Sequence, residues 1–304
     1  MNVLSLFDGI SCAMVAINRC NITIKEYFAS EIDKNAIAIS HKNYPNIKRL
    51  GCVKSIKTNL LPPIDLLIFG SPCQDLSIAK KGRKGLSGDR SGLFWDAVKI
   101  LKEIKPKYFI MENVASMKIS DRDIITKELG VKPILFDASL VSAQSRKRYF
   151  WTNIPFSLPE DKNILLKDIL LPADQISDIL WVKETRDIYI PEGQSTANIR
   201  VGRDIQRRIN NKGIRADNDK TITPIRRIEV RDDDKCGTLT SVLKDNQIVN
   251  IKDKRIRKID PIECERLQGL PDNYTSGISY THRYKALGNA FNVDVITHIL
   301  KQIC

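Results

Sequence analysis

The chain has 304 residues, which is enough for one large domain with an insert or for two domains. Its apolar content of 42% is ordinary for a globular protein, and its apolar runs are far too short to span a bilayer. The net charge of +13 is typical of a protein with a polyanionic partner, although many basic proteins bind none.

The first half of the chain alternates apolar runs with stretches of helical spacing. Strands are predicted at residues 2–7, 26–30, 64–69 and 108–111, and helices at residues 10–18, 33–41 and 93–104. This alternation is typical of an α/β domain with a mainly parallel sheet that helices cover on both faces. Ligands bind such sheets beyond the carboxyl ends of the strands. Four polar or reactive segments follow those ends: Asp8-Gly9, Glu31, Pro72-Cys73 and Glu112.

The pattern changes after about residue 151. Residues 155–250 are rich in Pro, Asn, Asp and Arg, with short β-like pieces at 221–225 and 238–243, which predicts a smaller β and loop region. A helix at residues 260–267, with Pro261 in its first turn and Gly269 after its end, then resumes the fold. An apolar helix is predicted at residues 290–303.

The basic residues are spread along the chain. Residues 181–260 hold 19 Lys and Arg against 13 Asp and Glu, and four more basic residues follow the Pro72-Cys73 turn. Each group taken alone is also compatible with an ordinary solvated surface.

The cysteines indicate a reducing compartment. The chain has seven, and no two of them form a CxxC pair, so a zinc site and a disulfide framework are both disfavoured. The first residues, MNVLSLFDG, lack the basic and long apolar regions of a signal peptide. We therefore expect a cytoplasmic protein without a bound metal.

Cys73 and Glu112 are the candidate reactive groups. Cys73 follows a buried strand on a proline turn, with basic residues close behind that favour a thiolate. Glu112 follows the strand at 108–111, where a carboxylate is costly unless it is paired or used. A thiol and a carboxyl at one edge suit addition to an electron-poor ring whose nitrogen the acid stabilises. The alternatives are a small apolar cysteine and a hydrogen-bonded structural glutamate.

Two further segments favour ligand binding. The first turn, FDGIS, is too poor in glycine for a dinucleotide pyrophosphate, and together with Glu31 it fits a small adenosyl cofactor. In QSRKR, Arg146 and Arg148 alternate along an extended segment, so their guanidinium groups are expected on one face, where they suit a phosphate or a base carbonyl. A surface ion pair is the alternative for these two arginines.

Taken in order, these segments resemble the cytosine-C5 DNA methyltransferase family. The matching runs are SLFDGIS, SPCQDLS, FIMENV, QSRKR, RKIDPIECERLQGLPDNY and YKALGNA. They cover nearly the whole chain except residues 155–235, and six motifs in the right order are far more specific than any one of them.

The resemblance implies a Rossmann-like methyltransferase domain with a mainly parallel sheet, formed by residues 1–154 and 288–304. It further implies a β/loop-rich target-recognition domain at 155–257 and a hinge at 258–287.

The resemblance also implies a reaction. The enzyme would methylate C5 of a cytosine that is flipped out of double-stranded DNA at a short specific sequence, with S-adenosylmethionine as the donor. Cys73 would attack C6 of the ring, Glu112 would contact N3 and the exocyclic amine, and Arg148 the O2 side. Asn113 would brace the site. The resemblance also places Asn113 and Arg146 among the catalytic residues.

The cofactor and DNA contacts are carried over in the same way. The positions that match cofactor contacts are Phe7, Asp8, Gly9, Ile10, Glu31, Ile32, Cys52, Val53, Pro72, Leu93, Asn289 and Ala290. Two of them depart from the family pattern: Ile32 stands where an aromatic residue often stacks on adenine, and Cys52 where an aspartate usually accepts from the adenine amine. The expected DNA contacts are Gln74, Ser77, Lys80, Lys81, Arg83, Lys84, Arg226, Arg227, Arg231, Thr238 and Leu239. Residues 74–91 would form a mobile loop over the flipped base, and residues 221–234 and 240–247 the base-reading loops.

Three other functions stay open. A cytosine-C5 tRNA methyltransferase on the same fold usually carries a Cys-Phe-Thr tripeptide, which is absent here. A catalytically inactive DNA-binding regulator would not need Cys73, Glu112 and Arg148 together. A pyrimidine-nucleotide enzyme such as a thymidylate synthase would not need the basic insert. The expected protein is a monomeric bacterial or phage enzyme of a restriction-modification system, and its DNA target sequence is not encoded in any motif.

Overall fold

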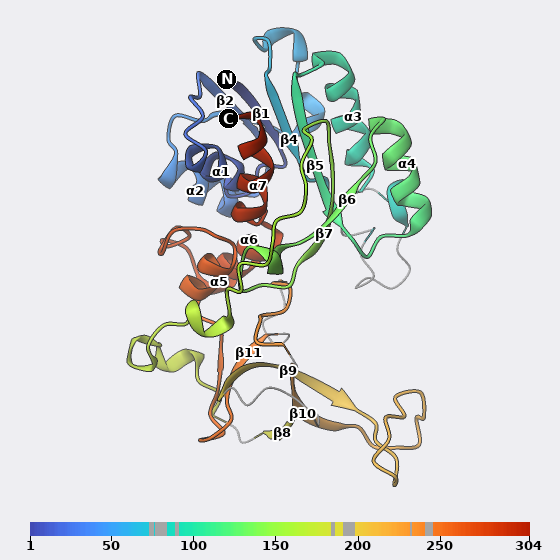
Figure 1. The fold of residues 1–304 in the computed structure, drawn as a ribbon, viewed down its shortest axis with the longest axis vertical. Coiled ribbons are helices and arrows are strands. Elements are labelled where there is room, and N and C mark those ends of the chain that lie inside the picture. Colours follow the sequence, from blue (N-terminus) through green and yellow to red (C-terminus); the bar gives the residue numbers. More distant parts are fainter. Residues whose placement is uncertain are drawn as a thin grey trace.

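The computed structural model describes residues 1–72, 76, 84–88, 91–183, 186–190, 198–231, 233–240 and 246–304. It has two lobes, each built around one sheet (Figure 1). None of the helices in these ranges combines the length and the apolar character that crossing a membrane requires.

The larger lobe contains a seven-stranded sheet with strand order β3-β2-β1-β4-β5-β7-β6. Its strands are β1 (Asn2–Leu6), β2 (Glu26–Ser30), β3 (Lys48–Gly51), β4 (Leu66–Phe69), β5 (Tyr108–Val114), β6 (Ile134–Asp137) and β7 (Lys147–Thr152). Neighbouring strands are parallel from β3 to β5, and β7 is antiparallel to both β5 and β6. The expectation of a mainly parallel α/β sheet is confirmed.

Helices cover both faces of this sheet (Figure 1). They are α1 (Cys12–Arg19), α2 (Lys34–Asn43), α3 (Leu93–Ile104), α4 (Ile119–Leu129) and α7 (Val293–Leu300). Alternate residues of β4 divide between two apolar clusters: Leu66 and Ile68 pack with α1 and α7, whereas Leu67 and Phe69 pack with α3 and α4. Because both faces are buried, the strand reads as one continuous apolar run.

The smaller lobe contains a five-stranded sheet with order β12-β11-β9-β10-β8. Its strands are β8 (Asp187–Tyr189), β9 (Ile199–Arg207), β10 (Ile225–Val230), β11 (Gln247–Asn250) and β12 (Ile256–Lys258). Two helices, α5 (Pro261–Leu267) and α6 (Tyr280–Asn289), lie between the two sheets (Figure 1). The carboxyl ends of β1, β4 and β5 point toward the smaller lobe.

Several expected elements need correction. Glu112 lies within β5, which continues to Val114, and not after its end. In the β-like piece at 221–225 only Ile225 is in a strand, as the first residue of β10, and residues 238–240 form no strand. The last helix begins at Val293 because Asn292 caps it by accepting a hydrogen bond from Val295 N. The helices α4 and α6 and the strand β6 were not predicted, since few of their residues are buried and their apolar pattern is weak.

Candidate active site

The turn after β4 lies beside the end of β5. The two strands pair in parallel, with Phe69 opposite Met111, so Gly70 to Pro72 run alongside the segment that begins at Glu112. Gly70 allows a close approach, because a Cβ atom there would lie 2.7 Å from the Phe291 ring. Six of the expected site residues, Cys73, Gln74, Ser77, Lys80, Lys81 and Arg83, lie outside the described residues.

Glu112 and Arg148 form an ion pair at this edge. Arg148 Nε lies 3.0 Å from Glu112 Oε1, and each side chain is 13% exposed. Arg148 stands on β7 opposite Val114, so the two side chains form a diagonal pair across neighbouring strands. A second guanidinium nitrogen, Nη1, donates to the Lys147 carbonyl at 2.8 Å, which further fixes the orientation of Arg148. The expected carboxylate and guanidinium are thus held together in a partly buried position.

Asn113 ties β5 to the turn after β4. Its side chain is buried, and Nδ2 donates to the carbonyl and the hydroxyl of Ser71 at 3.3 and 3.2 Å. On the other side of the turn, the Ser91 hydroxyl donates to the Pro72 carbonyl at 3.1 Å. These hydrogen bonds fix the backbone at Ser71 and Pro72, directly before Cys73.

Arg146 and Arg148 have different partners in the structure. Arg146 precedes β7 and is buried, and its guanidinium donates to the carbonyls of Leu239, Gly288 and Ala290 at 3.3, 3.3 and 2.8 Å. These three carbonyls come from the smaller lobe and from the segment that precedes α7. The position of Arg146 is therefore that of a brace between lobes, whereas Arg148 faces Glu112.

Gln144 also connects the two lobes, a role that its sequence context did not predict. It is fully buried, and its Oε1 accepts from Leu239 N at 3.1 Å while its Nε2 donates to the Leu267 carbonyl at 3.1 Å. Thr238 adds a hydrogen bond from its hydroxyl to the Ser145 carbonyl at 2.9 Å. Thr238 and Leu239 thus anchor their segment to the larger lobe, and Leu239 is buried rather than exposed to DNA. Gln144 is the first residue of QSRKR, so the sequence signal for this contact lies in the same motif as Arg146 and Arg148.

The turn after β1 has a backbone conformation suited to a bound ligand. Phe7 and Gly9 both have positive φ angles, 57° and 58°, so the chain turns sharply away from the strand end. Glu31 accepts from Gly9 N at 2.9 Å through Oε2 and from Ile32 N and Asp33 N at 2.7 and 2.8 Å through Oε1. Because a carboxylate oxygen can accept two hydrogen bonds, Oε2 keeps capacity for a ribose hydroxyl.

The side chain of Asp8 is unavailable to a ligand. It is buried and accepts from the hydroxyls of Ser11 and Tyr27, the latter at 2.8 Å. Burial raises the pKa of this carboxyl above its ordinary value, although the hydroxyl donors act in the opposite direction. The side chain of Asp8 therefore has a structural role, and the expected place of this residue among the cofactor contacts stays a prediction.

The other expected cofactor residues differ in exposure. Ile32 is 69% exposed and Cys52 is exposed as well, so both side chains can contact a ligand. Three more of these residues are at least partly exposed: Pro72, Leu93 and Asn289. Three others are buried and can support the site only by packing beneath its surface: Ile10, Val53 and Ala290. An exposed apolar side chain beside a carboxylate fits an adenosyl group, because adenine packs on apolar surface while its ribose needs a polar acceptor.

The arginines expected to read DNA are already engaged in ion pairs, and those of Arg226 and Arg231 are bidentate. Arg226 binds Asp204 at 2.8 and 2.6 Å, and Arg231 binds Asp233 at 2.7 and 2.6 Å. Arg227 binds Glu229 and lies over the Tyr189 ring at 4.0 Å. Lys84, another residue expected to contact DNA, has an exposed side chain. The acidic partners hold the arginine forks in fixed orientations, so any contact with DNA must exchange or share these partners.

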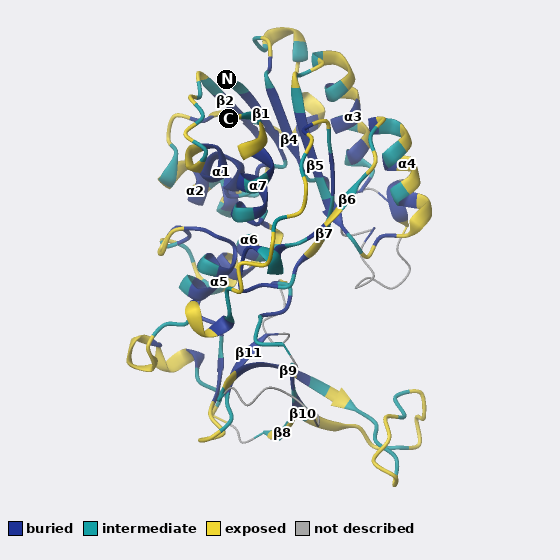
Figure 2. Cartoon of the chain, viewed as in Figure 1, coloured by how far each residue is buried: buried dark blue, intermediate teal, exposed yellow. Residues whose placement is uncertain are grey.

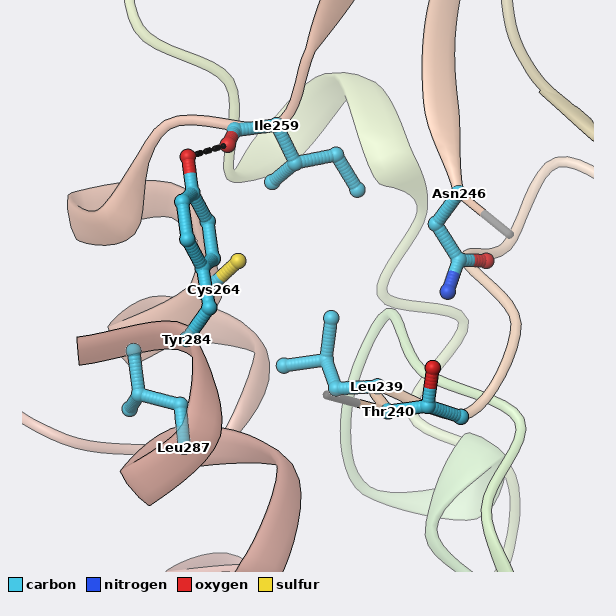
Figure 3. A pocket seen from close by; sticks show the side chains of 7 residues that line it. All are labelled: Leu239, Thr240, Asn246, Ile259, Cys264, Tyr284 and Leu287. Atoms are coloured by element: carbon cyan, nitrogen blue, oxygen red, sulfur yellow. Dashed lines mark hydrogen bonds between the residues drawn. The ribbon is translucent and has the colours of Figure 1, made fainter. Parts of the chain in front are cut away.

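Three of the described cysteines are structural. Burial raises the pKa of the thiols of Cys12, Cys236 and Cys264 well above the ordinary value, so they stay protonated near neutral pH. Cys264 lines a small pocket between the smaller lobe and α5 and α6 (Figure 3). Its volume of about 20 Å³ suits roughly one water molecule. The lining residues are Leu239, Thr240, Asn246, Ile259, Cys264, Tyr284 and Leu287.

Comparisons with known proteins cover the whole chain. Residues 1–304 match the family described as C-5 cytosine-specific DNA methylase. The chain is 26% identical over 331 residues to the Type II methyltransferase M.Bsp6I of Bacillus sp. (strain RFL6), covering all of this chain and 98% of that protein. It is 26% identical over 326 residues to the Type II methyltransferase M.HhaI of Haemophilus parahaemolyticus, covering 94% of it. The solved structure of the Entamoeba histolytica methyltransferase EhMeth has the same fold, with a TM-score of 0.68, 17% identity and coverage of 100% and 97% of the two chains.

Proposed function

Since the chain belongs to the C-5 cytosine-specific DNA methylase family and is a DNA (cytosine-5-)-methyltransferase, we propose that it methylates a cytosine flipped out of duplex DNA at a short specific sequence. The observation that carries this proposal is the Glu112–Arg148 pair, held at 3.0 Å beside the braced turn that leads into Cys73. These are the groups that a cytosine ring needs on its N3 and O2 side while a nucleophile attacks C6.

The proposed reaction proceeds through a transient covalent adduct. The Cys73 thiolate forms a bond to C6, and Glu112 stabilises the proton at N3 while Arg148 contacts O2, so that C5 becomes nucleophilic. The cofactor, when bound, supplies an electrophilic methyl group. After C5 has gained the methyl group, its proton leaves to a base, the C5–C6 double bond re-forms and the thiolate is eliminated. Asn113 contributes to these reaction steps only by holding the Ser71 turn in place.

The residues at the ends of β1, β2 and β3 fit S-adenosylmethionine. Glu31 would accept from a ribose hydroxyl through the remaining capacity of Oε2, and Ile32 would pack against adenine. Cys52 would lie near the adenine amine, in the place of the usual carboxylate. The Phe7 to Ile10 turn would contact the rest of the cofactor mainly through its backbone.

The remaining expectations complete the proposal. The catalytic domain comprises residues 1–154 and 288–304, the target-recognition domain residues 155–257 and the hinge residues 258–287. The protein works as a cytoplasmic monomer, and the Type II names of its relatives support a place in a restriction-modification system.

The test is methyl transfer to defined nucleic acids. The purified protein is incubated with S-adenosylmethionine and duplex DNA, single-stranded DNA, tRNA or free cytidine nucleotide, and 5-methylcytosine is then mapped by sequencing. We expect methylation of duplex DNA at one short sequence. Methylation of tRNA alone would identify the RNA enzyme, and methylation of the free nucleotide alone a nucleotide enzyme.

The covalent step has its own test. Duplex DNA with 5-fluorocytosine at the mapped site should trap the wild-type protein in a complex that survives denaturation, because fluorine cannot leave C5 as a proton does. Cys73→Ala should form no such complex and should not methylate, while it still binds DNA. A Cys73→Ala variant that turned over normally would overturn the mechanism.

A further inference from the structure

The connection between β9 and β10 forms a projection of the smaller lobe in which only residues 221–224 have an expected role, as the start of the base-reading loop at 221–234. We call residues 208–224 the arm; they continue the β9–β10 ribbon beyond its last strand pair, Arg207 with Ile225. The arm extends from the smaller lobe on the side of the molecule on which α3 and α4 lie (Figure 1). From Gly202, in the core of that lobe, to Asn210 the extended chain covers about 25 Å. That distance corresponds to roughly seven base pairs of B-form DNA.

The arm has no apolar core. None of the residues 205–227 is buried, and Figure 2 shows this part of the ribbon only as exposed or intermediate. An isolated two-stranded hairpin is at best marginally stable in water. Apolar packing therefore does not explain why this segment keeps a defined shape.

Hydrogen bonds and charges hold the arm instead. Ile209 bridges to Arg215, and Asn210 N donates to the Ile214 carbonyl at 2.9 Å, which closes a tight tip around Gly213. At the base of the arm, Asp217 accepts from Arg208 N at 3.1 Å and from the guanidinium groups of Arg207 and Arg215.

The acidic groups of the arm are thus engaged, and two lysines are not. Asp219 is bound by the Thr221 amide and hydroxyl, at 2.9 and 2.6 Å. Within residues 198–231, all of which the structure describes, the ammonium groups of Lys212 and Lys220 take part in no ion pair, and both lysines are exposed. The arm therefore presents two lysines without an ion-pair partner among the described residues, on a hydrogen-bonded ribbon.

We propose that the arm binds backbone phosphates of the DNA duplex outside the methylated site, with Lys212 and Lys220 as the contacting groups. The proposal rests on the proposed function, because it requires duplex DNA as the substrate. A two-stranded ribbon fits the major groove of B-form DNA, and phosphate contacts position a protein on the duplex without reading its sequence. The arm then enlarges the footprint and the affinity while the target sequence stays the same.

The test compares the salt dependence of binding on a long and a short duplex. Both carry the mapped target site at their centre; one is about 30 base pairs long and the other about 10, which is one helical turn. Each phosphate contact contributes about −0.9 to the slope of log K against log salt concentration. Lys212→Gln/Lys220→Gln should reduce the steepness of that slope by about 1.8 on the long duplex and leave the short duplex unchanged.

A matched control carries the same loss of charge elsewhere. Lys252 and Lys254 are exposed in the turn between β11 and β12, which lies beside the beginning of β9, at the opposite end of the sheet from the arm. Lys252→Gln/Lys254→Gln should change the slope on the long duplex by less than half as much. An equal change in this control would mean that net charge alone matters and would overturn the proposal.

Other outcomes are equally decisive. An unchanged slope in the arm variant would show that the arm does not touch DNA, and an equal loss on the short duplex would place it at the target site rather than beside it. The rate of methylation at saturating DNA should be the same in the arm variant and the wild type. If no form of the protein methylates DNA, the proposed function fails and no site can be mapped; the slopes of the wild type and the arm variant on a duplex of arbitrary sequence, about 30 base pairs or three helical turns long, then decide whether the arm binds phosphates.

Discussion

At the scale of single residues, the Glu112–Arg148 ion pair both compensates a partly buried charge and orients the two side chains. A carboxylate that is only 13% exposed needs a compensating charge, and Arg148 supplies it at 3.0 Å. The same contact orients both groups toward one edge of the sheet before any substrate arrives. Pre-orientation of this kind lowers the reorganisation that the reaction requires.

Glu112→Gln tests the carboxylate directly. The amide keeps the shape of the side chain but cannot stabilise a proton at N3, so we expect the methylation rate to fall by about two to four orders of magnitude. Single-turnover methylation of the mapped duplex measures this loss. The control is Glu128→Gln, which removes a surface pair with Lys102 at 2.7 Å and should leave the rate unchanged. A loss below about fivefold in Glu112→Gln would mean that this carboxylate is structural.

Cys52 offers a second test at this scale. Its thiol is exposed and is a weak acceptor, whereas a carboxylate there would accept strongly from the adenine amine. Cys52→Asp should therefore bind S-adenosylmethionine roughly tenfold more tightly, the lower end of what a charge-assisted hydrogen bond contributes. Calorimetric titration measures the affinity, and Cys52→Asn, which lacks the charge, should gain less. Equal or weaker binding by Cys52→Asp would show that residue 52 does not face the adenine.

At the scale of elements, buried ion pairs connect α5 to its neighbours. Arg257 on β12 binds Glu263 on α5 through two contacts of 2.7 Å, and Arg283 on α6 binds Glu265 at 2.9 Å. Glu263 also accepts from Asp260 N, which completes a capping box at the first turn of α5. A short helix with two buried carboxylates is stable here only because each carboxylate has a cationic partner.

Glu263→Gln should be strongly destabilising. It leaves the guanidinium of Arg257, a residue only 5% exposed, without its counter-ion, so we expect the free energy of unfolding to fall by roughly 3–5 kcal/mol. Urea denaturation measures the change. Asp253→Asn is the matched control, because its pair with Arg255 at 2.8 Å lies on the surface and contributes at most about 1 kcal/mol. Similar losses in both variants would show that burial does not decide the strength of these pairs.

At the scale of the whole molecule, one apolar cluster extends through both lobes. It contains Val3 and Ile296 from the larger lobe, Val201 and Ile248 from the second sheet, and Leu267 from α5 between them. Arg146 and Gln144 add buried hydrogen bonds across the same junction. The two lobes therefore share a core instead of meeting at a polar linker.

This shared core predicts cooperative unfolding. Thermal unfolding of the full chain should give one transition, with the calorimetric enthalpy equal to the van't Hoff enthalpy. Differential scanning calorimetry measures both values. Glu263→Gln should lower the temperature of that single transition without splitting it. Two resolved transitions in the wild type would contradict the shared core and would show that the lobes unfold independently.

The sequence by itself determined most of the parallel part of the fold, all but β3, and predicted which groups react. The strands β1, β2, β4 and β5 and the helix α3 follow from local patterns, because a strand buried on both faces is apolar throughout and an amphipathic helix repeats every 3.6 residues. The motifs around Glu31, Cys73, Glu112 and Arg148 are short and contiguous, so they could be read without any knowledge of contacts.

Only the tertiary structure decided how these groups are used. The separate roles of Arg146 and Arg148, the engagement of Asp8, the ion pairs of Arg226 and Arg231, and the shape of the arm depend on partners that cannot be read from a motif. Arg146, for example, binds carbonyls 93 and 144 positions away in the chain. Whether a charged side chain braces the protein or faces a ligand depends on which groups the fold brings within about 3 Å of it, and such long-range contacts leave no local periodicity in the sequence.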